Sequence, residues 1–210
     1  MTFPVLLAGP SGAGKTSIRD RLLSDDAPDY LFSVSMTTRA PRTGEVDGAD
    51  YRFVTRREFG DLVGRGEVLE HAEVHGELYG TPRMNLDAAL DAGRHLLLDI
   101  DVQGARQVRK AVPETVSIFV VPPSGARVLD RLRGRASETP EQLRRRLESA
   151  CRELDAVGEF DYLIVNDDLG RAVSEVRAIV TAESRSVRRA DGWSRSVARS
   201  LRDEIATAMS

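Results

Sequence analysis

The sequence Gly9-Pro10-Ser11-Gly12-Ala13-Gly14-Lys15-Thr16, followed by Ser17, decides the fold. It matches the pattern G-x-x-x-x-G-K-[ST], with an apolar run (residues 4–8) before it and a helical pattern through Ile18 and Leu22 after it. Glycines let consecutive backbone N–H groups converge on phosphate oxygens, and the positive end of the helix faces the same anion. Lys15 supplies a mobile charge for the β- and γ-phosphates, and Thr16 supplies a hydroxyl for Mg²⁺. This stretch predicts nucleoside triphosphate binding but leaves the phosphoryl acceptor open.

The composition excludes several classes of protein. The chain has 210 residues, of which 41% are hydrophobic, and a net charge of -3. A disordered chain is less apolar, and a protein held to nucleic acid by a broad basic surface is more basic. The sequence contains no run of about 18 apolar residues, so no membrane span is predicted. The N-terminus is typical of a buried strand rather than a signal peptide. Because Cys151 is the single cysteine, we expect a cytoplasmic protein with Cys151 as a small core residue.

The order of apolar segments predicts an α/β fold. Buried strands are expected at residues 4–8, 95–100, 116–121 and 161–165, with helices between them. Such an alternation predicts a mostly parallel sheet covered on both faces, and it indicates one core from residues 1–34, 95–123 and 156–210. Residues 35–94 and 124–155 interrupt the alternation and are expected to be insertions.

Smaller elements are also predicted. Further strands are expected at residues 32–36 and 51–55, and near residues 68–74. Thr81 is the expected N-cap of a helix with Pro82 at its first position. Ser124 is expected to cap another helix, and the helix from about Pro140 is expected to bury Leu143, Leu147, Ala150, Cys151 and Leu154. The chain is expected to end in one long arginine-rich helical tail.

The segment from Ser33 to Phe53 carries a second group of candidate residues. Arg39 and Arg42 lie three apart on a loop stiffened by Pro41, and Tyr51 follows. A guanidinium group binds phosphate in a bidentate manner, so the two arginines are candidates to hold an acceptor phosphate. On this stretch alone, a solvated loop with incidental charges explains the pattern as well.

Several motifs together resemble the guanylate kinase family. These are the phosphate loop, S-x-S-x-T-T-R-x-P-R-x-G-E-x-x-G-x-D-Y-x-F from Ser33, and then LEHAEV, LYGTP, LLLDIDVQG, RLRGRASET and DYLIVND in the same order. The resemblance covers residues 4–185. It implies a P-loop nucleoside triphosphate-binding core, a GMP-binding domain at residues 35–94 and a lid at residues 124–155. One departure is Ala136, where the family often has glycine.

The resemblance assigns the GMP-binding residues. Four positions are implied to hold the GMP phosphate: Arg39, Arg42, Tyr51 and Tyr79. Four are implied to face the base: Ser35, Glu70, Thr81 and Asp101. The chemistry agrees, because guanine presents N1–H and N2–H₂ donors side by side and an ionised Glu70 accepts both. Adenine has a lone pair at N1 and would leave a buried carboxylate unpaired, and such a site discriminates by roughly 10⁴ or more.

The donor side and the metal are assigned in the same way. Arg135 and Arg146 are implied to contact the ATP phosphates, with Arg131 a weaker candidate, and Asn166 is implied to contact adenine. Mg²⁺ is expected to bind Thr16 directly and Asp99 through water, although a strand-end acid such as Asp99 also has an ordinary structural explanation. His71, His75 and His95 have no metal-ligand spacing and are expected to be structural.

The predicted function is ATP-dependent phosphorylation of GMP, and of dGMP, to the diphosphate with release of ADP. The catalytic candidates are Lys15, Arg39, Arg42, Arg135 and Arg146. Two alternatives remain: an inactive interaction module of the same fold, and a related kinase acting on a sugar phosphate. The expected partners are ATP and GMP, without nucleic acid or membrane, and the sequence leaves open whether the chain is a monomer or a homo-oligomer.

Overall fold

The structure, a computed structural model, describes residues 1–24, 29–74, 76–133, 140–189 and 191–209. Its strands are β1 (Val5–Ala8), β2 (Tyr30–Phe32), β3 (Met36–Thr37), β4 (Arg52–Phe53), β5 (Val68–Val74), β6 (Glu77–Pro82), β7 (His95–Asp99), β8 (Val116–Val121) and β9 (Tyr162–Val165). Its helices are α1 (Lys15–Ser24), α2 (Arg56–Gly64), α3 (Arg83–Asp91), α4 (Val102–Ala111), α5 (Gly125–Arg133), α6 (Pro140–Leu154), α7 (Leu169–Ser184) and α8 (Asp191–Ala208), with a 3₁₀ turn at Val157–Glu159.

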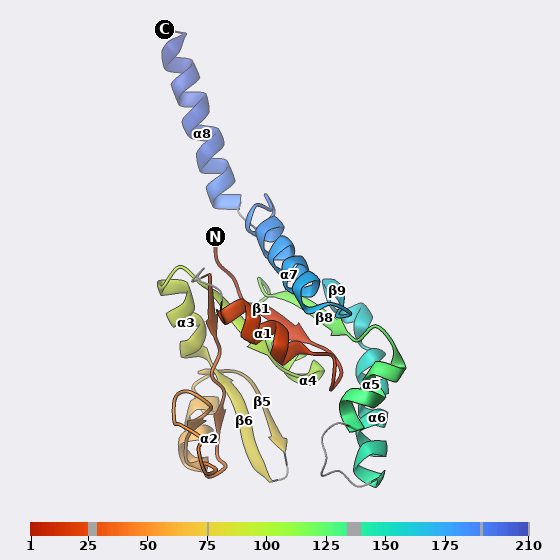
Figure 1. The fold of residues 1–210 in the computed structure, drawn as a ribbon. Helices are drawn as coiled ribbons and strands as arrows, with labels where there is room; N and C mark the ends of the chain where they lie inside the picture. The colour runs from red at the N-terminus through yellow and green to blue at the C-terminus, as the bar shows by residue number, and fades with distance from the viewer. Residues whose placement is uncertain (25–28, 75, 134–139, 190, 210) are drawn as a thin grey trace.

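Five parallel strands form the core sheet, in the order β2-β7-β1-β8-β9 (Figure 1). In the central strand β1, Val5 and Leu7 face one hydrophobic cluster while Leu6 and Ala8 face the other. Successive side chains of a strand point to opposite faces, so a strand buried on both sides must be apolar throughout. The predicted parallel sheet is confirmed.

Helices cover both faces of this sheet. Ile18 of α1 and Val176 of α7 belong to the cluster on one face, and Leu86 of α3 and Val108 of α4 belong to the cluster on the other. The predicted two-sided covering is therefore confirmed. The helix α3 packs on the core sheet although it comes from the segment predicted to be the inserted GMP-binding domain.

A second sheet lies beside the core, in the order β4-β3-β6-β5 (Figure 1). Its β3–β6 and β5–β6 pairs are antiparallel, and its β3–β4 pair is parallel. The helix α2 packs on it through Phe59, which is buried. A Cβ at Gly80 of β6 would lie 3.1 Å from the Phe59 ring and 2.8 Å from the Glu70 carbonyl oxygen, so glycine permits this close packing.

Two predicted elements differ in the region where the chain passes between the sheets. The single strand predicted at residues 32–36 is two short strands, because β2 joins the core sheet and β3 joins the second sheet. Thr81 was predicted to be a helix N-cap, and this is wrong. Thr81 belongs to β6, and the N-cap of α3 is Pro82, which has no side-chain capping bond. Cross-strand pairing with β5 extends β6 up to the helix.

Two burial predictions are also wrong. The strand β9 was expected to be buried, but Leu163 and Val165 are exposed because β9 is an edge strand. Cys151 was expected in the core and is exposed. Ala150 is buried while Cys151 and Leu154 are exposed, so the buried face of α6 is narrower than predicted. By contrast, the predicted capping by Ser124 agrees with its acceptance of a hydrogen bond from Arg127 N.

The C-terminal region is two helices rather than one continuous tail. The helix α7 packs against the core sheet, and α8 projects away from it (Figure 1). Within the described residues, no helix has the length and apolar character needed to cross a membrane.

Candidate active site

The predicted phosphate loop connects β1 to the first residue of α1. Gly9, Gly12 and Gly14 have positive φ angles of 132°, 85° and 91°. At Gly9, a Cβ would also lie 2.1 Å from the carbonyl oxygen of Val120 in β8. Residue 9 must therefore be glycine both for its backbone angle and for its contact with the neighbouring strand. The loop and the positive end of α1 form a site suited to phosphate.

Lys15 and Thr16 begin α1 at the end of this loop. Lys15 Nζ donates a hydrogen bond of 2.6 Å to the Gly9 carbonyl oxygen. Thr16 Oγ1 donates one of 3.2 Å to Asp99 Oδ2 at the end of β7. Burial raises the pKa of Asp99, while the charges of Lys15 and Arg19 act to lower it. The structure thus brings the predicted phosphate-binding lysine together with both predicted metal-site residues.

A cavity of about 430 Å³ opens beside the loop, and its lining includes Ser17, Asp99, Arg146 and Asn166. Arg146 reaches the loop from α6, where its Nη2 donates a 2.7 Å hydrogen bond to Ser11 Oγ. This contact places the arginine beside the predicted ATP phosphates.

Asn166 is buried, and its Nδ2 donates a 2.8 Å hydrogen bond to the Ala13 carbonyl oxygen. Its amide nitrogen therefore supports the loop, and its contact with adenine stays a prediction. Arg135 and Ala136 lie outside the described residues, as does the side chain of Arg131.

Arg39 is held by Glu45 in the loop between β3 and β4. Its Nη1 and Nη2 each donate a hydrogen bond of 2.9 Å to a different carboxylate oxygen of Glu45. Glu45 also accepts the Arg42 backbone N–H at 2.7 Å. These bonds, led by that from Arg39, lower the pKa of Glu45 to about 2. Glu45 therefore stays ionised and fixes the plane of the guanidinium group.

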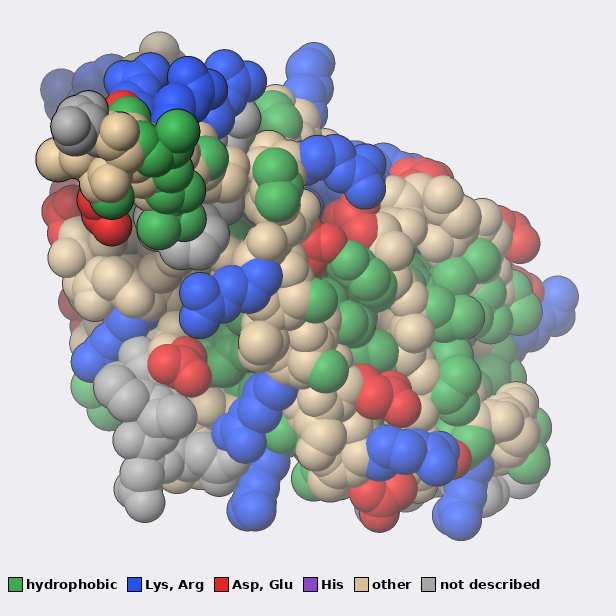
Figure 2. Space-filling model, turned by 90° about the horizontal axis from the view of Figure 1, so that it is seen from above, with side chains coloured by type: hydrophobic (Ala, Val, Ile, Leu, Met, Phe, Trp, Pro, Cys, Tyr) green, Lys and Arg blue, Asp and Glu red, His purple; other side chains and the backbone are tan. Residues whose placement is uncertain are grey.

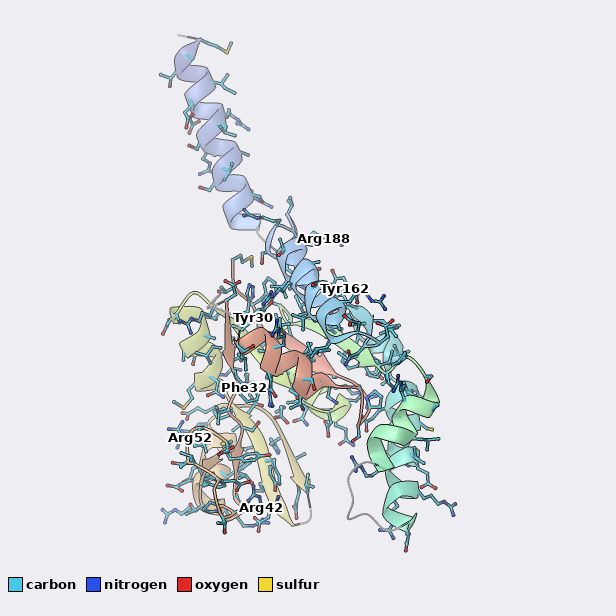
Figure 3. The ribbon with its side chains drawn as sticks, in the orientation of Figure 1. Tyr30, Phe32, Arg42, Arg52, Tyr162 and Arg188 are labelled. Carbon is cyan, nitrogen blue, oxygen red and sulfur yellow. The ribbon has the colours of Figure 1, made fainter. Side chains whose placement is uncertain are left out.

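The predicted phosphate-binding residues surround this arginine. Its guanidinium lies 5.4 Å from the centre of the Tyr51 ring, and the Tyr51 and Tyr79 rings meet edge to face at 5.9 Å. Arg42 is exposed, and Figure 3 shows it beside the second sheet, away from the core sheet. The structure thus groups Arg39, Tyr51 and Tyr79, with Arg42 on the same loop.

Sequence reasoning missed the role of Glu45. The residue was part of the quoted motif, but no function was attached to it. The signal was its spacing, six residues after Arg39 within a loop punctuated by Pro41 and Gly44. A carboxylate at that distance in a turn is able to fold back onto an arginine, but only the loop geometry shows that it does.

Three of the predicted base-recognition residues, Glu70, Thr81 and Asp101, meet where β5, β6 and α4 come together. Glu70 and Thr81 are paired across β5 and β6, and Thr81 Oγ1 donates a 2.7 Å hydrogen bond to Glu70 Oε1. Burial raises the pKa of Glu70, the Thr81 bond opposes this, and the charge of Asp101 adds to it. Asp101 caps α4 by accepting the Gly104 N–H at 2.8 Å.

Ser35 lies between β2 and β3, where its backbone carbonyl oxygen accepts the Arg52 N–H at 2.9 Å. It is half-buried. Gln107 of α4, which sequence reasoning also missed, binds both backbone groups of His71 in β5, at 3.1 Å to the N–H and 3.0 Å to the carbonyl oxygen. These bonds tie the strand that carries Glu70 to a helix of the core.

His95 is a buried histidine of the core. His95 packs against Phe3 at 4.4 Å between ring centres and accepts the Phe3 N–H at 3.3 Å, so its predicted structural role agrees with its contacts. His75 lies outside the described residues. Across the part of the chain that the structure describes, no three His, Cys, Asp or Glu side chains are grouped to hold a metal ion.

A sequence model of the guanylate kinase family matches residues 1–183. The chain belongs to the guanylate kinase family. The guanylate kinase of Nocardia farcinica is 50% identical over 184 residues, which cover 86% of this chain and 95% of that protein. The guanylate kinase of Corynebacterium efficiens is 48% identical over 178 residues, covering 84% and 93%.

The crystal structure of guanylate kinase from Anaplasma phagocytophilum has the same fold, with a TM-score of 0.69 and 38% identity, covering 90% of this chain and 89% of that one. These similarities make the chain a P-loop kinase of the guanylate kinase type. They do not favour either alternative, the inactive module or the sugar-phosphate kinase.

Proposed function

We propose that the protein transfers the γ-phosphoryl group of ATP to GMP, and to dGMP, giving ADP and the guanosine diphosphate. The observation that carries this proposal is the buried Glu70 carboxylate, hydrogen-bonded by Thr81 in a structure that also holds a complete phosphate loop. A sugar-phosphate kinase has no use for such a carboxylate. An inactive module has no need of Lys15 at the loop.

Guanine recognition follows from the hydrogen-bonding groups of the base. Ionised Glu70 accepts the N1–H and N2–H₂ donors of guanine, while Ser35, Thr81 and Asp101 complete the base site. Adenine offers an acceptor where the carboxylate also accepts, so its binding would leave a buried charge unpaired. The pocket is therefore selective because of the polar groups that a wrong base leaves unsatisfied.

The GMP phosphate binds at the arginine and tyrosine group. Arg39, Arg42, Tyr51 and Tyr79 supply its hydrogen bonds. Among the described residues, Arg39 Nε is the one fully buried side-chain nitrogen or oxygen without a hydrogen-bond partner. Both Nη atoms donate to Glu45, and Nη1 also donates to the Ala40 carbonyl oxygen. The Nε N–H is therefore a donor that Arg39 keeps for a phosphate oxygen.

The reaction is a direct in-line transfer. An oxygen of the GMP phosphate bonds to the γ-phosphorus of ATP as the bond from that phosphorus to the β–γ bridging oxygen breaks, which releases ADP. Lys15, Arg135 and Arg146 neutralise charge on the transferred group, and no side chain forms a covalent intermediate. Closure of the GMP-binding domain and the lid excludes water, which would otherwise hydrolyse ATP.

Mg²⁺ fits the oxygen atoms present beside the loop. The Thr16 hydroxyl would bind it directly and Asp99 through water, because a hydroxyl and a carboxylate are the hard donors that this ion prefers. When bound with ATP, the ion neutralises phosphate charge.

A cytoplasmic location remains a prediction.

The direct test is a coupled assay that offers ATP with GMP, dGMP, AMP, CMP, UMP or a sugar phosphate. We expect kcat/KM for GMP to exceed that for AMP by roughly 10⁴, with dGMP also accepted. Equal rates with GMP and AMP would contradict the proposal.

A variant of Lys15 tests the binding of the ATP phosphates. Lys15→Ala should lose turnover because the transferred group loses its positive partner, while calorimetry should show GMP binding unchanged, since Lys15 lies outside the base pocket. Wild-type turnover in Lys15→Ala would exclude the role given to the loop.

A further inference from the structure

Gly104, in the first turn of α4, lies against the carboxylate of Glu70. A Cβ at residue 104 would be 3.1 Å from Glu70 Oε2, 3.4 Å from Glu70 Cδ and 3.3 Å from Ile100 Cδ1. Contacts this short require the neighbouring atoms to move by a few tenths of an ångström.

The helix itself does not require glycine at this position. Gly104 lies within a regular helix and is not among the glycines with positive φ. A glycine inside a helix is less favourable than alanine by roughly 0.5–1 kcal/mol. The reason for glycine must therefore be the space that it leaves, and that space borders Glu70.

Glu70 is restrained on its other sides. Thr81 Oγ1 binds Oε1 at 2.7 Å, and the side chain is only 8% exposed. Gln107 holds the next residue of the strand, His71, by both of its backbone groups. The carboxylate has little freedom to move away from a side chain placed at residue 104.

The same helix turn also positions Asp101, whose carboxylate accepts the Gly104 N–H at 2.8 Å. Two carboxylates assigned to the guanine base thus converge on the positive end of α4, where the helix dipole favours negative charge. The missing Cβ at residue 104 leaves room for the Glu70 carboxylate beside this turn.

We propose that Gly104 is a positioning residue for guanine selectivity: the missing Cβ leaves the space in which Glu70 holds its carboxylate at the distance that guanine requires. This inference rests on the proposed role of Glu70 in binding GMP. Gly104 does not touch the reacting atoms, and it acts through Glu70.

Gly104→Ala tests the proposal, with Gly60→Ala as its matched control. Gly60 is an exposed glycine inside α2, and a Cβ there would meet nothing within 4 Å. We expect Gly104→Ala to raise KM for GMP roughly tenfold and to lower the preference for GMP over AMP, because Glu70 is displaced. The kcat and the melting temperature should not fall, since alanine favours the helix, and KM for ATP should not rise. Gly60→Ala should keep the wild-type KM for GMP.

An unchanged KM for GMP in Gly104→Ala would overturn the inference. A parallel loss of kcat, of ATP affinity or of melting temperature would also overturn it, because that pattern indicates a general role in packing α4. Thermal unfolding separates this case from a specific effect on the base pocket.

A double-mutant cycle with Glu70→Gln identifies the route of the effect. If Gly104 acts through Glu70, the alanine should add little to KM for GMP once Glu70 is glutamine, whereas additive effects would contradict the inference. If Glu70→Gln itself kept full preference for GMP over AMP, the proposed role of Glu70 would fall and this inference with it. Loss of preference in Glu70→Gln with a normal Gly104→Ala would reject only the role of Gly104.

Discussion

We propose that guanine selectivity depends on Glu70, and the environment of its carboxylate makes it sensitive to pH. Burial, with the nearby charge of Asp101, raises its pKa above the ordinary value of 4.5 although the Thr81 hydroxyl opposes the shift. The folded protein therefore takes up a proton at Glu70 at a higher pH than the unfolded chain. A protonated carboxyl group accepts only one of the two guanine donors well.

We therefore expect KM for GMP to rise as the pH falls, and the rise to begin above the ordinary glutamate value of 4.5 because the pKa of Glu70 is raised. The same shift affects the free energy of unfolding. Because ionising the buried Glu70 is unfavourable, the stability that its protonated form contributes is lost as the pH rises through its raised pKa. Glu70→Gln should remove this acid limb and gain stability relative to the wild type as the pH rises. Steady-state kinetics and thermal unfolding across the pH range measure both effects. An identical acid limb in Glu70→Gln would assign the limb to another group.

Glu45 is the second residue with a testable role. Glutamine at position 45 keeps the shape but loses one acceptor and the charge, so Arg39 loses its two-point anchor. We expect Glu45→Gln to raise KM for GMP roughly tenfold with KM for ATP unchanged.

Glu58→Gln is the control for Glu45→Gln. Glu58, in α2, is also a carboxylate whose pKa is lowered by hydrogen bonds, in its case from Thr55 at the start of the helix. The Glu58→Gln substitution should lower stability without changing KM for GMP. Equal GMP kinetics in Glu45→Gln and the wild type would show that Arg39 needs no anchor.

At the scale of elements, β8 and β9 show how the position of a strand in the sheet sets the burial of its side chains. Phe119 and Leu163 are paired in register, yet Phe119 is fully buried and Leu163 is 54% exposed. The Phe119 ring also packs against Phe160, with 4.9 Å between ring centres. An interior strand is covered on both faces, whereas the edge strand has one face open to solvent.

We expect Phe119→Ala to lower the free energy of unfolding by about 3–5 kcal/mol because it leaves a cavity in the core. In a chain of this size the melting temperature should fall on the order of 10 °C. Leu163→Ala, its register partner, should change stability by less than about 0.5 kcal/mol. Calorimetry or circular dichroism measures both, and similar losses would contradict the assigned burial.

The whole molecule consists of a nucleotide-binding body and a projecting helix, α8. Seen from above, this helix carries hydrophobic and arginine side chains on different sides (Figure 2). Its exposed apolar residues include Val197, Leu201 and Ile205, which recur every four residues. The match to the family ends at residue 183, before α8 begins.

Because the site residues all come from the body, deletion of residues 191–210 should leave kcat and both KM values within about twofold of the full chain. The melting temperature should change little, since the helix buries few of its described side chains. Steady-state kinetics and thermal unfolding of the shortened chain provide the test. A large loss of activity would show that α8 supports the site.

The sequence by itself determined the features that depend on neighbouring residues. The positive φ angles at Gly9, Gly12 and Gly14, and the start of α1 at Lys15, follow from a short glycine-rich turn between an apolar strand and a helix. Apolar runs alternating with helices predicted the parallel core sheet. The order of the motifs, by resemblance, named the family and the acceptor.

Only the tertiary structure decided which distant side chains meet. Thr81 looks like a helix cap within its own segment, but the register of β5 and β6 places its hydroxyl on Glu70. Cys151 is exposed because the buried face of α6 is set by what packs against it, and Gly104 matters because β5 crosses α4 at that turn. The physical reason is that local backbone preferences act over a few residues, whereas burial and cross-strand contacts depend on segments far apart in the chain.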